Sequence, residues 1–506
     1  MSTLLTRKRI LVGIVTLAGV TIGGSAFFML HQGSKYPVDW TGRSEVNIKL
    51  TARGFVPEMV YVSNGTKITF STVLDEPFWP ASNVHPFHTV YPEFDSRAPV
   101  SPGSTWSFVF NKNGRWTYHD HVAATKSGVV IVVPSGEKGE DKFNISAQCD
   151  QTHKEAQYSC WYEQLRYALE SKGVDAVFDE LSRLYKSDSN FFKKCHSLTH
   201  DIGLLAYAQS GIATNILEKT GYCNDGFWHG FMEGFFVDHQ DPADAYAFCE
   251  EIRKKFGATY PLAFTQCHHG IGHGGAEYLI NSRTDLWGAI PKLAALFVPL
   301  CQDMGVDKRN CAYGTYSTLA NWMFVQKRYD TLLDAQSFVS LCADATESWA
   351  REGCMFEFSK RMHFYPTQNP ADIFPQILKY GNTIDEGAYI PLMVEGGAMS
   401  MSQFSQHVED DKLIQPCRAL PPSLRTACLQ GVTQGLFFSA APGDEPERVA
   451  RFCLSNVLSA DEQATCVATE INLVVNSYAS GALKEVCLLF PDDLISDIKM
   501  CADTLQ

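Results

Sequence analysis

The chain has 506 residues, of which 45% are hydrophobic and 19% are charged, a composition typical of a globular protein with two or three domains. Its formal net charge is −14 at pH 7, and it contains no basic stripe and no cluster of interleaved arginine and aromatic residues. Because nucleic-acid phosphates would be repelled by this charge, the sequence excludes nucleic acid as a partner.

The N-terminus has the pattern of a membrane anchor. Arg7, Lys8 and Arg9 precede an apolar run over residues 10–30, which is about the 20 residues that a membrane-spanning helix needs. The basic residues are expected to stay in the cytoplasm. Residues 1–35 are therefore predicted to be a cytoplasmic stub and a single-pass anchor that holds the chain at the cell membrane. A cleaved signal peptide is the alternative, although no clear cleavage site follows the run.

The cysteines favour an extracytoplasmic location. The chain has 16 of them, and none precedes residue 149. In an oxidising compartment such cysteines form disulfides. The bulk of the chain is therefore expected in the periplasm or at the cell surface.

Residues 42–134 have a β pattern. Short runs of β-branched and aromatic residues alternate with turn dipeptides such as Asn64-Gly65 and Asn113-Gly114. The runs are at 46–50, 59–62, 67–70, 106–110 and 128–133. This spacing predicts a β-sandwich, and the polar residues after it predict a linker over 135–148.

Residues 149–506 are predicted to be a Cys-rich α-helical repeat domain. Cysteines come in neighbouring pairs, and glycine-containing motifs follow several of the second cysteines. The pattern indicates a degenerate repeat of roughly 35–55 residues, each unit being two helices joined by its own disulfide. Pairing of neighbours is a hypothesis, because spacing alone does not fix connectivity. The expected pairs are Cys149/Cys160, Cys195/Cys223, Cys249/Cys267, Cys301/Cys311, Cys342/Cys354, Cys417/Cys428, Cys453/Cys466 and Cys487/Cys501.

The β region resembles a known family. G-F-V-P-E-M-V-Y-V-S-N-G-T-K-I-T-F at 54–70, S-P-G-S-T-W-S-F-V-F at 101–110 and G-R-W-T-Y-H-D-H at 114–121 are similar to strands of cupredoxins, the plastocyanin-like proteins. The resemblance covers about residues 44–134 and implies a Greek-key sandwich. The predicted fold class is therefore an N-terminal transmembrane helix, an all-β cupredoxin-like Greek-key sandwich, and an all-α disulfide-stapled helical-repeat domain.

Two histidine motifs sharpen this resemblance. H-P-F-H at 85–88 and H-D-H at 119–121 are similar to the HPxH and HCH segments of multicopper oxidases. The resemblance implies that His85 and Asp120 take blue-copper positions and that His88, His119 and His121 take trinuclear-cluster positions. The departure is Asp120, which replaces the cysteine thiolate, and the chain has only one such domain.

The residues themselves also indicate a metal. On a strand, His119 and His121 point to one face and Asp120 to the other, and the loop with His85 and His88 could fold over that face. Imidazoles without sulfur suit Cu(II), and also Zn(II) or Ni(II). We therefore expect a non-blue copper site, with purely hydrogen-bonded histidines as the alternative.

The helical region holds a second histidine group. Three pairs are spaced i, i+4, which places each pair on one helix face: His196 and His200, His229 and Glu233, and His269 and His273. Such a set suits Zn, Fe or Cu, and buried structural histidines are the alternative. Asp201 and Glu233 are candidate catalytic proton carriers if a metal is present.

A glycine stripe accompanies these histidines. Gly226, Gly230 and Gly234 lie on one face of the predicted helix. Each glycine costs about 1 kcal/mol in a helix, so the stripe predicts a partner backbone packed tightly against it.

Together these features predict a membrane-anchored extracytoplasmic metalloprotein with a copper-binding β domain and a His-rich helical centre. If it is an enzyme, a copper-linked oxidoreductase is favoured over a metal-dependent hydrolase. A non-enzymatic protein for metal binding or surface interaction is the third hypothesis. The sequence identifies neither a substrate nor a protein partner.

Overall fold

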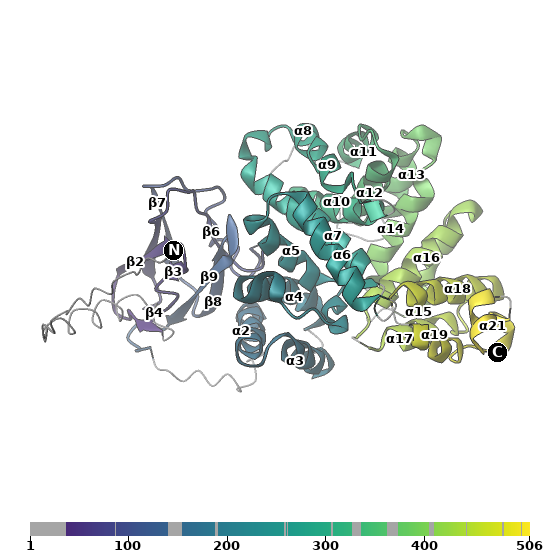
Figure 1. The fold of residues 1–506 in the computed structure, drawn as a ribbon, viewed down its shortest axis with the longest axis horizontal. Coiled ribbons are helices and arrows are strands. Elements are labelled where there is room, and N and C mark those ends of the chain that lie inside the picture. Colours follow the sequence, from purple (N-terminus) through teal and green to yellow (C-terminus); the bar gives the residue numbers. More distant parts are fainter. Residues whose placement is uncertain are drawn as a thin grey trace, which may run out of the picture.

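The computed structural model describes residues 37–505 apart from 87, 140–153, 188–190, 258–259, 261, 305–306, 326–334, 362–372, 404–408, 442, 478–479 and 497. Strands form the first part of this chain and helices the second (Figure 1). The β region packs directly against the first helices of the helical region (Figure 1).

The β region consists of two sheets packed around an aromatic core. Phe70, Phe94, Phe110 and Tyr118 are fully buried between the sheets and contact one another through their rings. The sheet orders are β1-β4-β9-β8-β6 and β3-β2-β5-β7. The strands are β1 (Val38–Asp39), β2 (Glu45–Thr51), β3 (Gly54–Val56), β4 (Met59–Ser63), β5 (Thr66–Thr72), β6 (Pro80–Ser82), β7 (Thr105–Phe110), β8 (Gly114–Asp120) and β9 (Ala123–Val133).

The predicted fold class is wrong and needs two corrections. The β region is formed by mixed sheets, because β1–β4, β2–β5 and β4–β9 pair in parallel while the other pairs are antiparallel. Apart from the antiparallel pairs β2–β3 and β8–β9, each strand lies in the other sheet from the strand before it, and some strands therefore pair with partners that run in the same direction. Hydrophobic alternation shows which face of a strand is buried but not the direction of its neighbour.

The second correction concerns the membrane anchor. In the part of the chain that the structure describes, no helix is both long enough and apolar enough to cross a bilayer. Residues 10–30, on which the predicted anchor rested, lie outside the described residues. The longest described helix, α7 (Leu262–Ser282), has 21 residues. It carries histidines and Glu277, and charged groups of this kind are costly within a bilayer.

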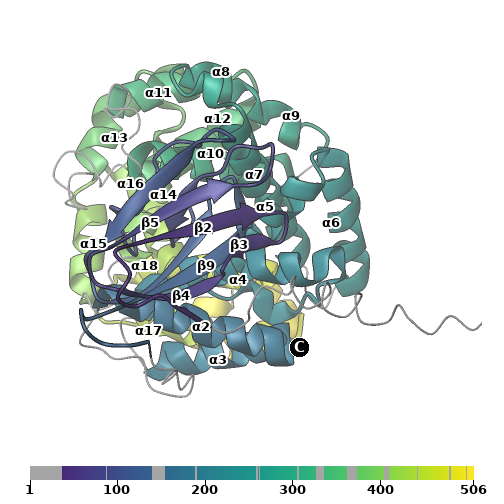
Figure 2. The ribbon, with the colours of Figure 1, turned by 90° about the vertical axis from the view of Figure 1, so that its left-hand side faces the viewer.

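The helical region has two rows of helices. Neighbours along the inner row are α4, α5, α7, α10, α12, α14, α16 and α18. The outer helices α3, α6, α8, α11, α13, α15 and α17 lie around the periphery in Figure 2. The two rows curve so that the first helices meet later ones: the Tyr185 hydroxyl on α3 donates to the Ser439 carbonyl 2.9 Å away, directly after α16.

The helix bounds are α2 (Lys154–Lys172), α3 (Val174–Ser187), α4 (Phe192–Ser210), α5 (Gly226–Asp238), α6 (Pro242–Phe256), α7 (Leu262–Ser282), α8 (Ile290–Ala295), α9 (Phe297–Cys301), α10 (Lys308–Val325), α11 (Ala335–Ala343), α12 (Ser348–Ser359), α13 (Ile373–Gly381), α14 (Ile390–Gln403), α15 (Asp410–Arg418), α16 (Pro422–Phe438), α17 (Glu445–Cys453), α18 (Ala460–Ser477), α19 (Ser480–Cys487), α20 (Asp492–Ile495) and α21 (Lys499–Leu505).

Disulfides join helices that are close in sequence. The bond between Cys249 and Cys267 links α6 to α7, and the bonds that follow link α9 to α10, α11 to α12, α15 to α16, α17 to α18 and α19 to α21. The seventh, Cys195 to Cys223, ties α4 to the segment before α5. All seven pair neighbouring cysteines, as predicted; Cys149, the expected partner of Cys160, lies outside the described residues. The cysteines of each pair are 10 to 28 residues apart. A disulfide that closes a loop of about 15 residues reduces the conformational entropy of the unfolded chain and stabilises the folded protein by about 3 kcal/mol.

The glycine stripe on α5 packs against α4. A Cβ atom added at Gly226 would lie 2.3 Å from the carbonyl oxygen of His196, and one added at Gly230 would lie 1.9 Å from that of His200. The predicted close approach of a partner backbone is therefore confirmed. It brings the histidines of α4 next to those of α5.

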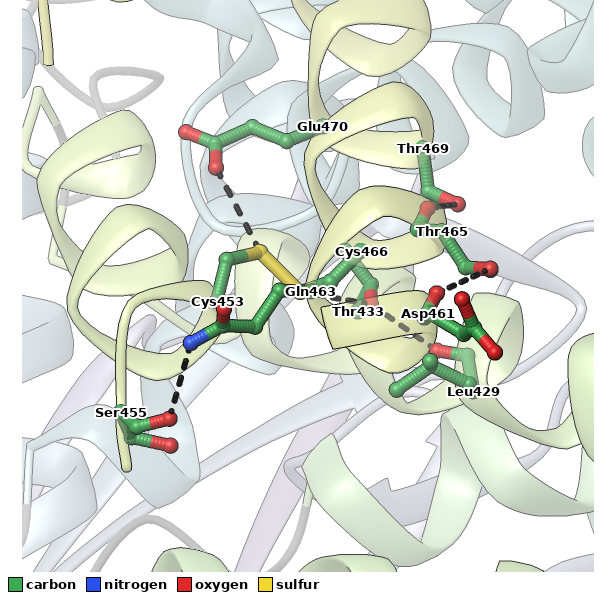
Figure 3. The surroundings of a disulfide bond; sticks show 10 residues. All are labelled: Leu429, Thr433, Cys453, Ser455, Asp461, Gln463, Thr465, Cys466, Thr469 and Glu470. Atoms are coloured by element: carbon green, nitrogen blue, oxygen red, sulfur yellow. Dashed lines mark hydrogen bonds between the residues drawn. A yellow bond between two sulfur atoms is a disulfide. The ribbon is translucent and has the colours of Figure 1, made fainter. Parts of the chain in front are cut away.

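A buried carboxyl group lies beside one disulfide. Glu470 on α18 is fully buried, and one of its oxygens lies 3.9 Å from the Cys453 sulfur in the bond to Cys466 (Figure 3). Burial, and to a lesser extent the charge of Glu447, raises the pKa of Glu470 to about 9. In the unfolded chain the same group has a pKa near 4.5. Folding therefore favours the protonated carboxyl group.

This shift predicts a pH-dependent gain from Glu470→Met. Since the folded pKa is raised, wild type keeps its stability below about pH 4.5 and loses about 1.4 kcal/mol per pH unit as the pH rises toward 9. The variant has no such loss, so its advantage in melting temperature should be larger at pH 8 than at pH 5 in differential scanning calorimetry. The exposed control Glu485→Met should give the same small difference at both pH values. A pH-independent effect of Glu470→Met would contradict the prediction.

Candidate metal centre

The candidate site lies where the two regions meet. Strands β8 and β9 face α2, α4 and α5. The Thr117 hydroxyl on β8 lies 3.2 Å from the Ser159 hydroxyl, and the Arg115 guanidinium donates to the Glu163 carboxylate at 3.0 Å. These contacts hold β8 against α2, while β9 lies beside α4 and α5.

Four buried histidines converge at this end of the β region. Strand β6 pairs with β8, with Ala81 opposite His119, so the loop after β6 lies beside the end of β8. The loop supplies His85 and His88, and the strand end supplies His119 and His121. One nitrogen of each lies within 4.8 Å of the others. The H-P-F-H and H-D-H motifs therefore form one cluster.

The nitrogen separations in this cluster match the edges of a metal coordination sphere. His85 Nδ1 lies 3.0 Å from His119 Nε2, and His88 Nε2 lies 2.9 Å from His121 Nδ1. Two nitrogens that each bind a metal at about 2.0–2.1 Å lie about 3 Å apart.

Carboxylate and amide groups orient two of these rings. His88 Nδ1 lies 2.9 Å from the Asp95 carboxylate, which also accepts the Trp79 indole N–H at 2.7 Å. Burial alone would raise the pKa of Asp95, but the hydrogen bonds from His88 and Trp79 hold it below its usual range. His119 Nδ1 lies 3.2 Å from the Asn83 side-chain oxygen. Such partners fix the ring orientation of metal-ligating histidines.

Asp120 does not belong to the cluster. Its Oδ1 accepts the backbone N–H of Trp79 at 2.8 Å and that of Val122 at 3.3 Å. Burial raises its pKa to about 6. Asp120 therefore fixes the turn after β8 rather than joining the four converging nitrogens.

Two glutamates from the helices meet the β-region cluster. His85 Nε2 lies 3.3 Å from Glu233 Oε2 on α5 and 3.6 Å from Glu277 Oε1 on α7. His121 Nε2 also lies 3.6 Å from Glu277 Oε1. His85, Glu233 and Glu277 form a second group of potential ligands, so the site combines residues from both regions.

The sequence prediction missed Glu277, although the repeat contains a signal for it. Counted from Cys223 and from Cys267, which begin equivalent units, a His-x-x-x-Glu pattern occurs at the same offset. In the first unit it gives Glu233, and in the second it gives Glu277. Alignment of the two units would therefore have identified both carboxylates.

A third group, called the deeper group because it lies between the helices and farther from the β region, contains His229 and His273, which are buried, and His269, which is half-buried. One nitrogen each of His229, His269 and His273 lies within 4.8 Å of the others. The rings of His229 and His273 stack with 3.7 Å between centroids. The His196 ring lies beside them, 5.0 Å from the His229 ring. Three inner helices thus contribute to this group, as the i, i+4 pattern predicted.

Hydrogen bonds fix the tautomers of the deeper histidines. His196 Nδ1 lies 3.0 Å from the Cys223 carbonyl oxygen, and His269 Nδ1 lies 3.1 Å from that of Asn310. A carbonyl can only accept, so each Nδ1 carries the proton and each Nε2 keeps its lone pair. His273 Nδ1 lies 2.7 Å from the Thr318 hydroxyl. The carbonyl contacts thus present Nε2 of His196 and of His269 as the ligand atom, whereas a hydroxyl can donate or accept and leaves both tautomers open to His273.

His200 lies between the two groups. Its Nε2 is 2.8 Å from Glu233 Oε1, and its ring stacks 6.0 Å from the ring of His85. The predicted helical set is therefore divided: Glu233 faces the β region, His200 bridges, and the other four histidines form the deeper group. The remaining neighbour, His268, lies apart and contacts Asp307 at 3.4 Å.

Burial keeps several of the site's imidazoles neutral at pH 7. It lowers the pKa of His196 and of His269 to about 4, and lowers those of His85 and His229 well below the usual value. Burial also raises the pKa of Glu233 well above its usual value. Neutral imidazole is the form that binds metals, so at pH 7 these histidines need not lose a proton to do so.

Two small cavities are both lined by His85, Glu233 and Glu277. One has a volume of about 90 Å³ and is lined by His121, Val237, Asn281 and Ser282 among others. The other has about 30 Å³ and reaches His196, His229 and His273. Val237 is 39% exposed, so the larger cavity extends toward the surface. Only small molecules could therefore reach the cluster.

Comparisons of the chain with protein-family models, with curated proteins and with solved structures found no match. The function of the chain is therefore inferred from the geometry of its own residues. It has buried histidine and carboxylate groups that could hold metal ions, and its disulfides indicate an extracellular or other oxidising environment.

Proposed function

We propose that this protein is an extracytoplasmic copper-dependent redox protein. Its main metal centre would lie between a cupredoxin-like β domain and the helical domain, with His85, His88, His119 and His121 as histidine ligands and Glu233 and Glu277 as carboxylate ligands. A second transition-metal ion would be held by His196, His229, His269 and His273.

The observation that carries the proposal is the position of His85. Its Nδ1 faces the β-region histidines, at 3.0 Å from His119 Nε2, and its Nε2 faces Glu233 at 3.3 Å. One imidazole thus lies between an all-histidine group and two carboxylates from another domain. Packing alone does not require an imidazole at this position, because an apolar side chain would fill the same space without the cost of burying polar atoms.

The buried polar atoms fit bound metal. His200 Nδ1, His273 Nε2 and both ring nitrogens of His229 make no hydrogen bond within the described chain. A buried polar atom without a partner costs about 1–3 kcal/mol. Coordination to metal ions would compensate this cost for several of these atoms together.

The donor set favours copper. Imidazole and carboxylate bind Cu(II) more strongly than the other divalent first-row metals. The described chain has no free cysteine, so a copper–thiolate bond is not expected and the site would not be blue. Copper would supply one-electron redox chemistry, while the chain's residues would hold the ion and exclude bulk water.

The cavity size favours redox chemistry over hydrolysis. A volume of about 90 Å³ is far below the roughly 300–1,000 Å³ of pockets that enclose larger organic ligands. Hydrolysis of a polymer would need more room than this. The short distance between the two groups, with His200 and Glu233 in contact at 2.8 Å, also suits exchange of electrons between two centres.

The test is metal analysis of the full-length chain produced in an oxidising compartment and loaded with Cu(II). Inductively coupled plasma mass spectrometry should find at least two equivalents of copper in wild type. The His88→Ala, His121→Ala variant should lose the interdomain copper, and the His269→Ala, His273→Ala variant the deeper one. Electron paramagnetic resonance should show Cu(II) that ascorbate reduces, without intense copper–thiolate absorption.

The matched control is His239→Ala, because the His239 side chain is 40% exposed and contacts Asp244 outside both groups. It should retain the copper content of wild type. Equal copper content in all variants would refute the proposed ligands. Copper that ascorbate cannot reduce, or zinc binding alone with a chelator-sensitive hydrolytic activity, would refute the redox function.

A further inference from the structure

A hydrogen-bonded chain crosses the interface from the helices to the metal cluster. His119 Nδ1 lies 3.2 Å from Asn83 Oδ1, and Asn83 Nδ2 donates to Asp201 Oδ2 on α4 at 2.6 Å. Asp201 is only 4% exposed. The carboxylate of one domain is thus connected to a histidine of the other by a single side-chain amide.

Asp201 holds this amide in one orientation. Besides Asn83, the Asp201 carboxylate accepts the Tyr158 hydroxyl at 2.8 Å and the backbone N–H of His85. A carboxylate only accepts, so Asn83 must turn its NH₂ group toward Asp201 and its oxygen toward His119. The His119 Nδ1 must then carry the proton, and Nε2 keeps the lone pair that faces His85.

We propose that Asp201 is a positioning residue for the interdomain metal centre: it fixes the tautomer and orientation of His119 through Asn83, and holds the backbone of the loop that carries His85. This inference rests on the proposed interdomain copper site. The helical domain would then have two roles at this centre. It would supply the ligands Glu233 and Glu277, and through Asp201 it would orient the β-domain ligands.

The geometry favours positioning over the proton-carrier role predicted for Asp201 from the sequence. The cavity shared by Asn83, His119 and Asp201 has only about 10 Å³, which is at most room for one water molecule. Asp201 reaches the His119 ring through Asn83. The carboxylate therefore acts through another side chain.

The test uses the full-length chain carrying His269→Ala and His273→Ala, so that only the interdomain copper contributes to the spectra. In this background, Asp201→Asn should lower Cu(II) affinity about 10- to 100-fold, as loss of an outer partner of a ligand does. It should also change the copper hyperfine splitting in electron paramagnetic resonance. Asn83→Ala should give the same spectral change, and the combined variant should be no worse than either alone.

The matched control is Asp238→Asn. Asp238 also accepts a tyrosine hydroxyl, from Tyr207 at 3.1 Å, but belongs to the exposed end of α5. It should leave affinity and spectrum unchanged. If Asp201→Asn does not fold, Asn83→Ala decides the question alone.

Copper bound with wild-type affinity and an unchanged spectrum in both variants would overturn the positioning role and leave the proposed function intact. A lower melting temperature with an unchanged copper spectrum would also overturn it, since that is the result of a purely structural role. Absence of copper from the parent background would instead refute the proposed function.

Discussion

Replacing His85 with alanine is expected to reduce Cu(II) affinity at the interdomain centre at least about 100-fold, which corresponds to about 2.7 kcal/mol. His85 belongs both to the cluster with His88, His119 and His121 and to the group with Glu233 and Glu277. Its loss therefore removes a ligand and separates the β-domain histidines from the helical carboxylates. No other residue of the described chain belongs to both groups.

This prediction is checked by copper titration against a competing chelator and by thermal unfolding with and without copper. Metal that binds only the folded chain raises its melting temperature, and most of this rise should be lost in His85→Ala. The control His239→Ala should retain it. If His85→Ala kept the affinity and the thermal shift of wild type, the interdomain centre would have to be rejected.

Gly230→Ala is expected to destabilise the chain by at least about 3 kcal/mol, at the upper end of the usual cost of overpacking. The added Cβ would lie 1.9 Å from the His200 carbonyl oxygen, whereas ordinary contacts begin at 3.4 Å. The obstacle is backbone on α4 rather than a flexible side chain. The two helices must separate, and His200 would move away from Glu233.

The measurements are calorimetric melting temperature and copper content. Gly230→Ala should lower both, because α4 and α5 carry ligands of the deeper group as well as Glu233. The matched control is Gly288→Ala, where an added Cβ meets no atom within 4 Å. A Gly230→Ala chain with wild-type stability would show that the close approach of α4 and α5 is not required.

The sequence by itself determined the local pieces of this protein. Paired cysteines predicted the seven described disulfides, because neighbouring helices in a repeat bring nearby cysteines together. The stripe at Gly226, Gly230 and Gly234 predicted the contact with α4, since glycine in a helix has a cost that close packing must offset. The two histidine motifs and the i, i+4 pairs identified most of the candidate ligands.

Only the tertiary structure decided how these pieces combine. The two histidine groups were predicted as separate sites, yet docking of β8 and β9 against α4 and α5 places Glu233 beside His85 at 3.3 Å. The same docking brings Asp201, which the sequence suggested as a proton carrier, into a hydrogen bond with Asn83. Periodicity reports which face of an element is buried, but not which other element covers it, and contacts between domains distant in sequence leave no local pattern.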